Sequence, residues 1–183
     1  MKNRLAKKDG VGMVEFIQVA GTAEIDRVAA LARQTWEHHY IPIIGRKQTE
    51  YMLVNFQSVP AIARQIASGY DYYLLKTEGR SVGYFALVHN AEAQSTLLSK
   101  IYVHPERQGE GLGRRIVAFA EECSLARGGR ELWLTVNRNN VSSIAFYEQV
   151  GFQNAGALVQ DIGHGFVMDD FKMIKTLSAT AVA

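Results

Sequence analysis

Residues 98–113 join a β-type sequence to a helical one through a glycine-rich loop. They read Leu-Ser-Lys-Ile-Tyr-Val-His-Pro-Glu-Arg-Gln-Gly-Glu-Gly-Leu-Gly, so the strand pattern breaks at Pro105 and an apolar stretch with helical spacing follows. A glycine loop that opens a helix directs several backbone N–H groups toward one point, and the helix dipole adds partial positive charge there. The junction therefore predicts an anion site, and a phosphate suits it.

Two common phosphate loops fit this stretch poorly. A Walker A loop needs Gly-Lys-Ser/Thr, whereas Arg114 follows Gly113 here. A dinucleotide fingerprint needs G-x-G-x-x-G, whereas Gly109, Gly111 and Gly113 are spaced G-x-G-x-G, with no acidic residue after a second strand at the expected place. Both interpretations are therefore weakened.

The length and composition suit one domain. The chain has 183 residues, of which 48% are hydrophobic, enough to bury a core. Residues 1–12 carry a net charge of +3 and residues 13–183 a net charge of −1. We expect residues 1–12 to be a disordered basic tail, 13–177 a single domain and 178–183 a short tail.

The composition also bears on partners and compartment. A near-neutral body lacks the basic surface of a nucleic-acid-binding protein. We find neither an apolar run of bilayer length nor a signal peptide, so we expect no membrane partner and a cytoplasmic location. Cys123 is the one cysteine, which excludes an intrachain disulfide and a cysteine-rich metal site. We expect Cys123 to be a small buried apolar residue and the protein to hold no metal.

The N-terminal part reads as a strand followed by helices. We expect a strand at 14–20, then a helix that Thr22 caps and that Pro42 ends. Residues 45–68 predict one or two further helices broken near Pro60.

The remainder alternates between strands and helices. Val82 begins the second strand of a predicted hairpin, and Gly128 follows the last turn of a predicted helix. Alternating Leu132, Leu134 and Val136 predict a buried strand. The expected elements are strands at 70–76, 82–89, 96–103, around 132–136, 152–162 and 166–175, and helices at 111–127 and from 139 or 140 to 150.

Two segments carry a family resemblance. Gln108-x-x-Gly111-x-Gly113, after a strand that ends in Val-His-Pro, resembles the Q/R-x-x-G-x-G/A signature of the GNAT superfamily of N-acetyltransferases. The later segment, with Asn140 opening a helix, Tyr147 two turns on and Gly-Phe at the next strand, is similar to the same family. The resemblance covers residues 80–175 well and residues 14–70 only by element order.

The resemblance implies an α/β (α+β) fold with a mixed, mostly antiparallel, twisted sheet flanked by helices. It also implies acetyl-CoA as the cosubstrate, with the loop amides on its pyrophosphate and the strand before the loop paired with its pantetheine arm. The residues that we expect to contact acetyl-CoA are Ile101, Tyr102, Val103, Gln108, Gly109, Glu110, Gly111, Leu112, Gly113, Arg114, Asn140, Ser143 and Tyr147.

Acetyl transfer to an amine needs a stabilised oxyanion and a protonated leaving thiolate. The Val103 amide is our candidate oxyanion donor, and Tyr147 our candidate general acid. A phenol of pKa about 10 is protonated at neutral pH, and a thiolate whose thiol has a pKa of about 8.5 can take its proton. The alternative is that Tyr147 packs its ring in the core beside Phe146, and Asn140 can also cap its helix.

The general base is open. Many members of the family place a Glu on the strand before the loop, but Ser99, beside Lys100, stands at the matching position. A relay through water and another group is the natural alternative. The other candidates are Glu37, His39, Glu92, Asp161 and His164, each of which also has an ordinary structural explanation.

The acceptor site should lie among the N-terminal helices and the last hairpin. Their aromatic residues Trp36, Tyr40, Tyr51 and Phe56 line a pocket or fill the core, and helical spacing favours the core.

The helical arrangement and the last strand loosely resemble polyamine and diamine acetyltransferases, and Asp161, Asp169 or Asp170 would suit a cationic amine. We expect an enzyme that acetylates a small-molecule amine by direct attack in a ternary complex. A protein or peptide N-acetyltransferase and a non-catalytic CoA sensor are the alternatives, and homodimerisation stays open.

Overall fold

The computed structural model describes residues 4–9 and 12–178, and these form two compact units. The first unit takes the described residues up to 87 together with 100–116, and the second takes 88–99 and the described residues from 117 onward. Strands β4 and β5 and helix α3 contribute residues to both units. We describe each unit by itself.

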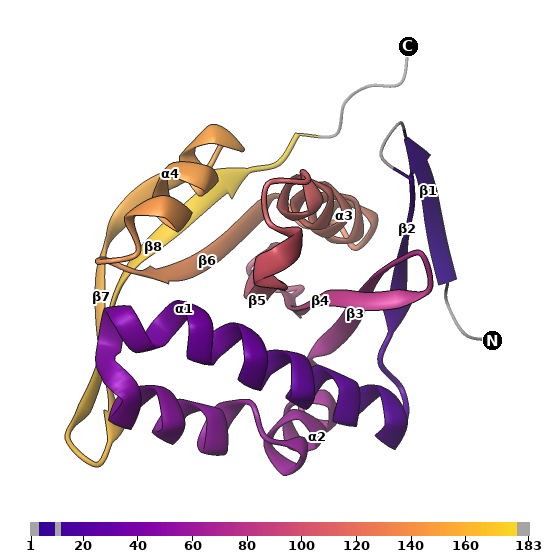
Figure 1. The fold of residues 1–183 in the computed structure, drawn as a ribbon. Helices are drawn as coiled ribbons and strands as arrows, with labels where there is room; N and C mark the ends of the chain where they lie inside the picture. Colours follow the sequence, from indigo (N-terminus) through magenta and orange to yellow (C-terminus); the bar gives the residue numbers. More distant parts are fainter. Residues whose placement is uncertain (1–3, 10–11, 179–183) are drawn as a thin grey trace. The chain divides into compact units, whose positions relative to one another are not determined.

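The first unit contains antiparallel strands and two helices (Figure 1). Strand β2 pairs with β1 on one side and with β3 on the other, and β3 forms a hairpin with β4. Glu78 and Gly79 turn this hairpin with φ of 51° and 75°, the left-handed conformation that tight hairpins require. The elements are β1 (Arg4–Asp9), β2 (Gly12–Gln18), α1 (Thr22–Phe56), α2 (Val59–Ala67), β3 (Asp71–Thr77), β4 (Arg80–Asn90) and the 3-10 helix η1 (Pro105–Arg107).

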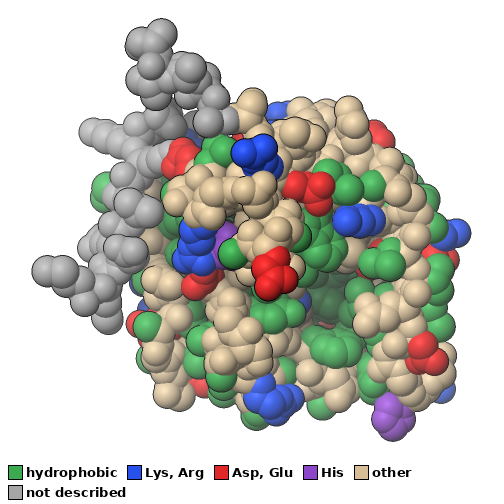
Figure 2. Space-filling view, turned by 180° about the vertical axis from the view of Figure 1, so that it is seen from behind, with side chains coloured by type: hydrophobic (Ala, Val, Ile, Leu, Met, Phe, Trp, Pro, Cys, Tyr) green, Lys and Arg blue, Asp and Glu red, His purple; other side chains and the backbone are tan. Residues whose placement is uncertain are grey.

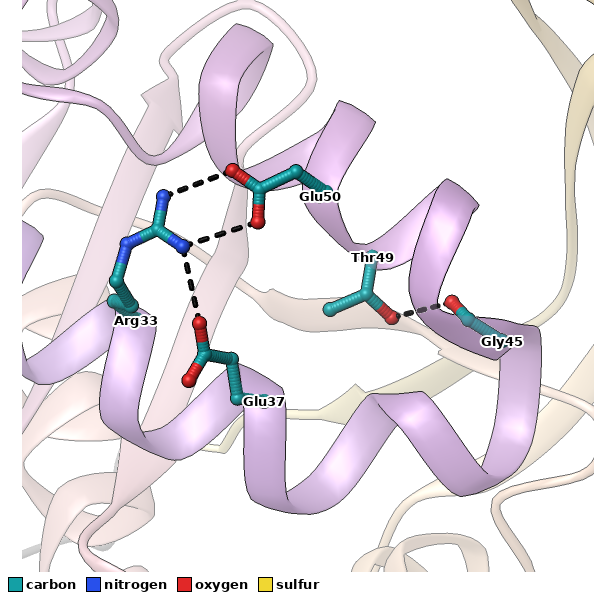
Figure 3. A network of polar contacts seen from close by, with 5 residues as sticks. All are labelled: Arg33, Glu37, Gly45, Thr49 and Glu50. Atoms are coloured by element: carbon teal, nitrogen blue, oxygen red, sulfur yellow. Dashed lines mark hydrogen bonds and ion pairs between the residues drawn. The ribbon is translucent and has the colours of Figure 1, made fainter.

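Helix α1 reverses its direction at Gly45, and Figure 3 shows its two legs facing each other. The sequence predicts an end at Pro42, but Pro42 lies inside the helix. A proline removes one backbone donor, whereas Gly45 adopts φ 79° and ψ 158°, which no helix can contain. The glycine therefore makes the break three residues later than predicted.

An ion-pair network joins the two legs of α1. The Arg33 guanidinium donates to both carboxylate oxygens of Glu50 at 3.0 Å and also to Glu37 at 3.0 Å (Figure 3). Because these side chains are exposed, solvent screens the network and its stabilisation is small. In the second leg of α1, Thr49 is buried and its hydroxyl donates to the Gly45 carbonyl oxygen at 2.8 Å.

The second unit is built around β6 (Glu131–Asn137), β7 (Gln153–Gly163) and β8 (Phe166–Thr176), which Figure 1 shows side by side. The first residues of β5 pair with β6 in parallel, while β8 pairs antiparallel with β6 on one side and with β7 on the other. The Lys175 amine donates to Glu121 and to the Val150 carbonyl, which attaches β8 to α3 and to the end of α4. The elements are β5 (Ser95–Val103), α3 (Leu112–Ala126), β6 (Glu131–Asn137), α4 (Val141–Gln149), β7 (Gln153–Gly163) and β8 (Phe166–Thr176).

The predicted strand and helix pattern is confirmed over most of the described residues. Leu132, Leu134 and Val136 are buried in β6 as their alternation predicts. Cys123 is half-buried, less than expected. Arg4–Asp9 forms β1, where we expected part of a disordered tail, because backbone pairing with β2 does not depend on an apolar side-chain pattern. The flanking residues 1–3 and 10–11 and residues 179–183 lie outside the described residues.

The reversal of α1 gives a stability prediction. Replacing Gly45 with Ala should destabilise the protein by about 1–3 kcal/mol, because this backbone region is essentially restricted to glycine. A Cβ at Gly45 would meet no atom within 4 Å, so the cost comes from the backbone and not from a clash. Chemical denaturation measures the change. Lys47→Ala, exposed in the second leg, is the control and should shift stability by less than about 0.5 kcal/mol.

Candidate functional site

The loop between η1 and α3 exposes its backbone. Gln108 is extended, Gly109 and Gly111 have φ of 84° and 74°, and α3 begins at Leu112. A Cβ on either glycine would meet no atom within 4 Å, so the backbone conformation and not crowding requires glycine. Backbone N–H groups in such a loop, directly before a helix, form a concave site that can bind an anion.

Side chains on both sides fix this loop. The Arg107 guanidinium donates to both carboxylate oxygens of Glu110, from Nε at 2.7 Å and from Nη2 at 2.8 Å. This bidentate pair lowers the pKa of Glu110, so that carboxylate is charged but neutralised by its neighbour. The Gln108 side-chain amide donates to the Val103 carbonyl at 3.3 Å, which connects the loop to the end of β5.

The end of β5 runs close to β4 inside the first unit. The His104 amide donates to the Val82 carbonyl at 2.8 Å. A Cβ built on Gly83 would lie 2.5 Å from the Tyr102 carbonyl oxygen and 3.3 Å from the Val103 Cα. Gly83 therefore permits a close approach of the β4 and β5 backbones, which the Cβ of any other residue would prevent.

In the second unit, Asn140 opens α4 as predicted. Its buried side chain accepts from the Ser143 amide at 3.3 Å and from the Ser142 hydroxyl at 3.4 Å. This capping satisfies a helix N–H group that would otherwise lack a partner.

Tyr147 is 7% exposed and packs between two phenylalanines. Its ring centroid lies 5.3 Å from that of Phe146 and 5.8 Å from that of Phe152. The Tyr147 carbonyl also accepts from the Phe152 amide at 2.9 Å, so the Gly-Phe turn holds the tyrosine in place. The Tyr147 ring therefore packs against its neighbours, as the alternative to an acid role predicts.

The predicted contact residues are divided between the units. Those on β5, in the loop and in the first turn of α3, from Ile101 to Arg114, belong to the first unit, where β5 leads through η1 into the loop. Asn140, Ser143 and Tyr147 belong to the second unit, all on α4 or at its cap.

Most candidate bases are engaged in local structure. Glu37 belongs to the Arg33 network, and the Asp161 carboxylate accepts from the Gly163 amide at 2.7 Å at the end of β7. His164 is exposed in the turn that follows, with φ 57°. The His39 ring packs edge-on against Tyr40 at 4.9 Å, and Glu92 is exposed in the turn between β4 and β5.

Sequence reasoning did not predict that aromatic residues of α1 meet aromatic residues of β4 and β5 in one cluster of the first unit. Trp36 and Tyr40 on α1 meet Tyr102 on β5, with centroid distances of 5.4 Å and 6.2 Å, and Tyr84 on β4 lies 5.2 Å from Tyr102. The Tyr40 and Tyr102 hydroxyls are 3.4 Å apart. Trp36 is buried, in agreement with the core interpretation, while Tyr40 and Tyr102 are half-buried.

Lys100 of β5 was not among the candidate bases, but its pKa is strongly shifted. Burial lowers the pKa of Lys100 to about 8. The signal in the sequence is a charged residue inside an otherwise apolar strand, next to Ser99.

The acidic residues of β8 differ in their surroundings. Asp169 pairs with Arg138 at 2.7 Å and is half-buried. Asp170 is 5% exposed, and burial raises its pKa, partly offset by a hydrogen bond from Thr135. A carboxyl group in this position is a poor anionic partner for an amine in solution.

The comparisons with known proteins identify the family. The sequence model of the Acetyltransferase (GNAT) family matches residues 25–152. The chain belongs to this family. The GNAT resemblance of the loop and of the Asn140–Tyr147 segment is thereby confirmed.

One similar protein is the ribosomal protein bS18 alanine N-acetyltransferase of Escherichia coli (strain K12). It is 34% identical over 79 residues, which cover 43% of this chain and 53% of that protein. The matched region thus spans about half the length of this relative.

Solved structures show the same GNAT fold. The PaiA N-acetyltransferase of Thermoplasma acidophilum, in complex with coenzyme A, has a TM-score of 0.74 at 21% identity and covers 89% of this chain and 98% of its own. A chimera of the spermidine N-acetyltransferase SpeG from Vibrio cholerae has a TM-score of 0.65 at 17% identity, over 89% and 95% of the two chains. The predicted fold class, a mixed and mostly antiparallel sheet flanked by helices, is confirmed.

The structure also bears on other partners. In residues 4–9 and 12–178, no helix is both long and apolar enough to cross a membrane. The same ranges contain no group of three or more His, Cys, Asp or Glu arranged to hold a metal ion. Basic and acidic side chains are interspersed on the face drawn in Figure 2.

The burial of Asp170 gives a prediction about pH. Because the folded protein raises its pKa, stability falls as the pH rises and the folded carboxyl group loses its proton. Asp170→Asn removes this charge, so it should raise Tm by a few °C near pH 7, and the difference should shrink as the pH falls toward about 4.

Thermal unfolding from pH 4 to pH 8 measures this effect. Asp161→Asn, exposed on the same hairpin, is the control and should leave Tm nearly unchanged. A variant at Asp170 that melts below the wild type at pH 7 would contradict the prediction.

Proposed function

We propose that the protein transfers an acetyl group from acetyl-CoA to a primary amine by direct attack in a ternary complex. The observation that carries this proposal is the glycine loop before α3, with left-handed backbone at Gly109 and Gly111. Membership of the GNAT family supports it. Under this proposal the protein is an enzyme that needs acetyl-CoA as its cosubstrate and uses no metal.

The loop fits a pyrophosphate on three grounds. Its glycines leave the backbone open, the positive end of α3 lies directly behind it, and the Arg107 pair neutralises the nearby Glu110. The Gln108 amide donates to the Pro105 carbonyl at 3.3 Å, so of the amides from Gln108 to Arg114 that the sequence indicates, we assign the pyrophosphate to those from Gly109 to Arg114. Ile101 to Val103 of β5 would pair with the pantetheine arm, and Asn140 and Ser143 would complete the contacts with CoA.

The chemical step has a defined balance. The amine nitrogen attacks the thioester carbonyl carbon, whose oxygen becomes an oxyanion that the Val103 amide would stabilise. The acceptor nitrogen loses one proton to solvent water, collapse breaks the C–S bond, and the CoA thiolate takes a proton. We assign that proton to Tyr147, whose hydroxyl is protonated at neutral pH.

The acceptor has two candidate classes. The spermidine N-acetyltransferase among the structural neighbours favours a small amine, which is our first choice. The ribosomal-protein alanine N-acetyltransferase among the relatives favours a protein N-terminus.

One assay tests the function and separates these classes. The purified full chain is incubated with acetyl-CoA and spermidine, single amino acids or an alanine-terminated peptide, and thiol release is followed. Release with spermidine or amino acids supports the small-amine enzyme, and release with the peptide alone supports the second class. Tight CoA binding without release for any acceptor would instead indicate a sensor and overturn both enzyme interpretations.

The loop itself can be tested by one substitution. Gly111→Ala should weaken CoA binding at least about tenfold, equivalent to about 1.4 kcal/mol, because alanine disfavours the φ of 74° that shapes the loop. Isothermal titration with CoA measures the affinity. Gly165→Ala is a matched control, because Gly165 has φ 76° and equally open surroundings in the turn between β7 and β8. Equal affinity losses in both variants would argue against the loop assignment.

The acid role of Tyr147 gives another prediction. Tyr147→Phe should lower kcat about 100-fold with little change in CoA affinity, since the ring still packs between Phe146 and Phe152 while the proton donor is lost. Steady-state kinetics near pH 7.5 measure the effect, with Tyr70→Phe as the control. A variant with full kcat would leave Tyr147 with its packing role alone.

A further inference from the structure

Tyr40 of α1 and Tyr102 of β5 meet through their hydroxyl groups in the first unit. The two oxygens lie 3.4 Å apart, and both side chains are half-buried. An ordinary O–H···O hydrogen bond is shorter, at about 2.7–2.8 Å, and a phenol oxygen can accept as well as donate. An N–H donor that approaches between the two oxygens can therefore bond to both.

Aromatic contacts hold the rings that carry these hydroxyls. Trp36 is buried one turn before Tyr40 on α1, and its ring centroid lies 4.4 Å from that of Tyr40 and 5.4 Å from that of Tyr102. Tyr84 of β4 packs against Tyr102 at 5.2 Å. This packing fixes the positions of both hydroxyls, and the negative faces of such rings attract a positive charge. The cluster thus suits a cationic N–H donor.

The hydroxyl pair belongs to the end of β5 that we assign to the reacting thioester. Tyr102 directly precedes Val103, whose amide is the proposed oxyanion donor, and consecutive Cα atoms lie about 3.8 Å apart.

A site that favours a cation does not suit the attacking nitrogen of the acceptor. That nitrogen has to give up its positive charge before it can bond to carbon, so binding its ammonium form would stabilise the unreactive state. A second nitrogen of the same acceptor keeps its charge throughout the reaction. The cluster therefore fits this second nitrogen better than the first.

We propose that Tyr40 and Tyr102 bind a second, positively charged nitrogen of the acceptor, which makes the acceptor a diamine or a longer polyamine. The proposal rests on the acetyltransferase function proposed above and assigns the residues that select among small amines. The ammonium group donates to both phenol oxygens and lies against the aromatic rings, while the neutral amine at the other end attacks the thioester. Tyr40 and Tyr102 position the acceptor and take no part in bond making.

Paired substrates and variants test this assignment. Putrescine and n-butylamine share one alkyl chain and differ by a terminal nitrogen, and each is assayed with the wild type, Tyr40→Phe and Tyr102→Phe. The wild type should have a kcat/KM for putrescine at least about tenfold above that for n-butylamine, as expected for hydrogen bonds from a charged donor. Each variant should raise the KM for putrescine about tenfold and leave kcat unchanged, because the hydroxyls bind the ground state and the transition state alike. The kinetics with n-butylamine should stay the same.

Controls separate recognition from packing. Both substitutions keep the aromatic ring, so Tm and CoA affinity should stay close to the wild-type values. The double variant should raise the KM for putrescine by less than the product of the two single effects, because one nitrogen bonds to both oxygens. Tyr70→Phe removes a hydroxyl from a half-buried ring that stacks on Tyr72 at 6.4 Å, and it should keep the wild-type KM for both amines.

The remaining outcomes would overturn the assignment. If the wild type acetylates both amines equally well, or if the Phe variants keep the wild-type KM for putrescine, the pair binds no second nitrogen while the proposed function stands. Equal losses with both amines would place the hydroxyls in the fold or at the attacking nitrogen instead. If thiol is released with neither amine, the assignment fails; release with the alanine-terminated peptide would leave acetyl transfer standing, and no release with any acceptor would remove the proposed function as well.

Discussion

The left-handed conformation of two glycines, Gly109 and Gly111, shapes the loop on which the proposed function depends. Their left-handed backbone turns the chain from β5 into α3 over a few residues and leaves the loop amides exposed. A loop of this kind needs support, since free N–H groups in a mobile segment would lose binding energy to ordering. The bidentate Arg107–Glu110 pair and the Gln108 contact with Val103 provide that support within the loop and its strand. Rigidity and openness are thus combined in one short segment.

The sequence predicted the features that depend on local chemistry. Glycines and prolines marked the turns, apolar alternation identified β6, and an asparagine before a helix identified the Asn140 cap. These signals work because each acts on its own backbone or on residues one turn away. The glycine loop and the Asn140–Tyr147 segment of the site were predicted for the same reason.

Features that depend on distant partners could not be predicted in this way. The Tyr40–Tyr102 hydroxyl pair joins residues 62 positions apart, and Arg33 meets Glu50 only because the chain reverses at Gly45. Strand β1 has no side-chain pattern that indicates a strand, and its backbone pairing comes from β2. The shifted pKa of Lys100 likewise arises from burial, which the composition of β5 alone does not reveal. The general base stayed open in the sequence analysis, because Ser99 stands where many members of the family carry a Glu.

Gly83 shows how a residue outside the loop constrains it. No special backbone angle requires glycine there; the requirement is the distance to the neighbouring strand, since an added Cβ would lie 2.5 Å from the Tyr102 carbonyl oxygen. A side chain at this position would push apart the backbones that carry Tyr102 and Val103 and so disturb both faces of β5 at once. A substitution at position 83 of β4 would therefore change the backbone positions of Tyr102 and Val103 in β5. Selection for an intact β5 would therefore remove substitutions of Gly83, while substitutions at exposed positions of the same hairpin would be tolerated.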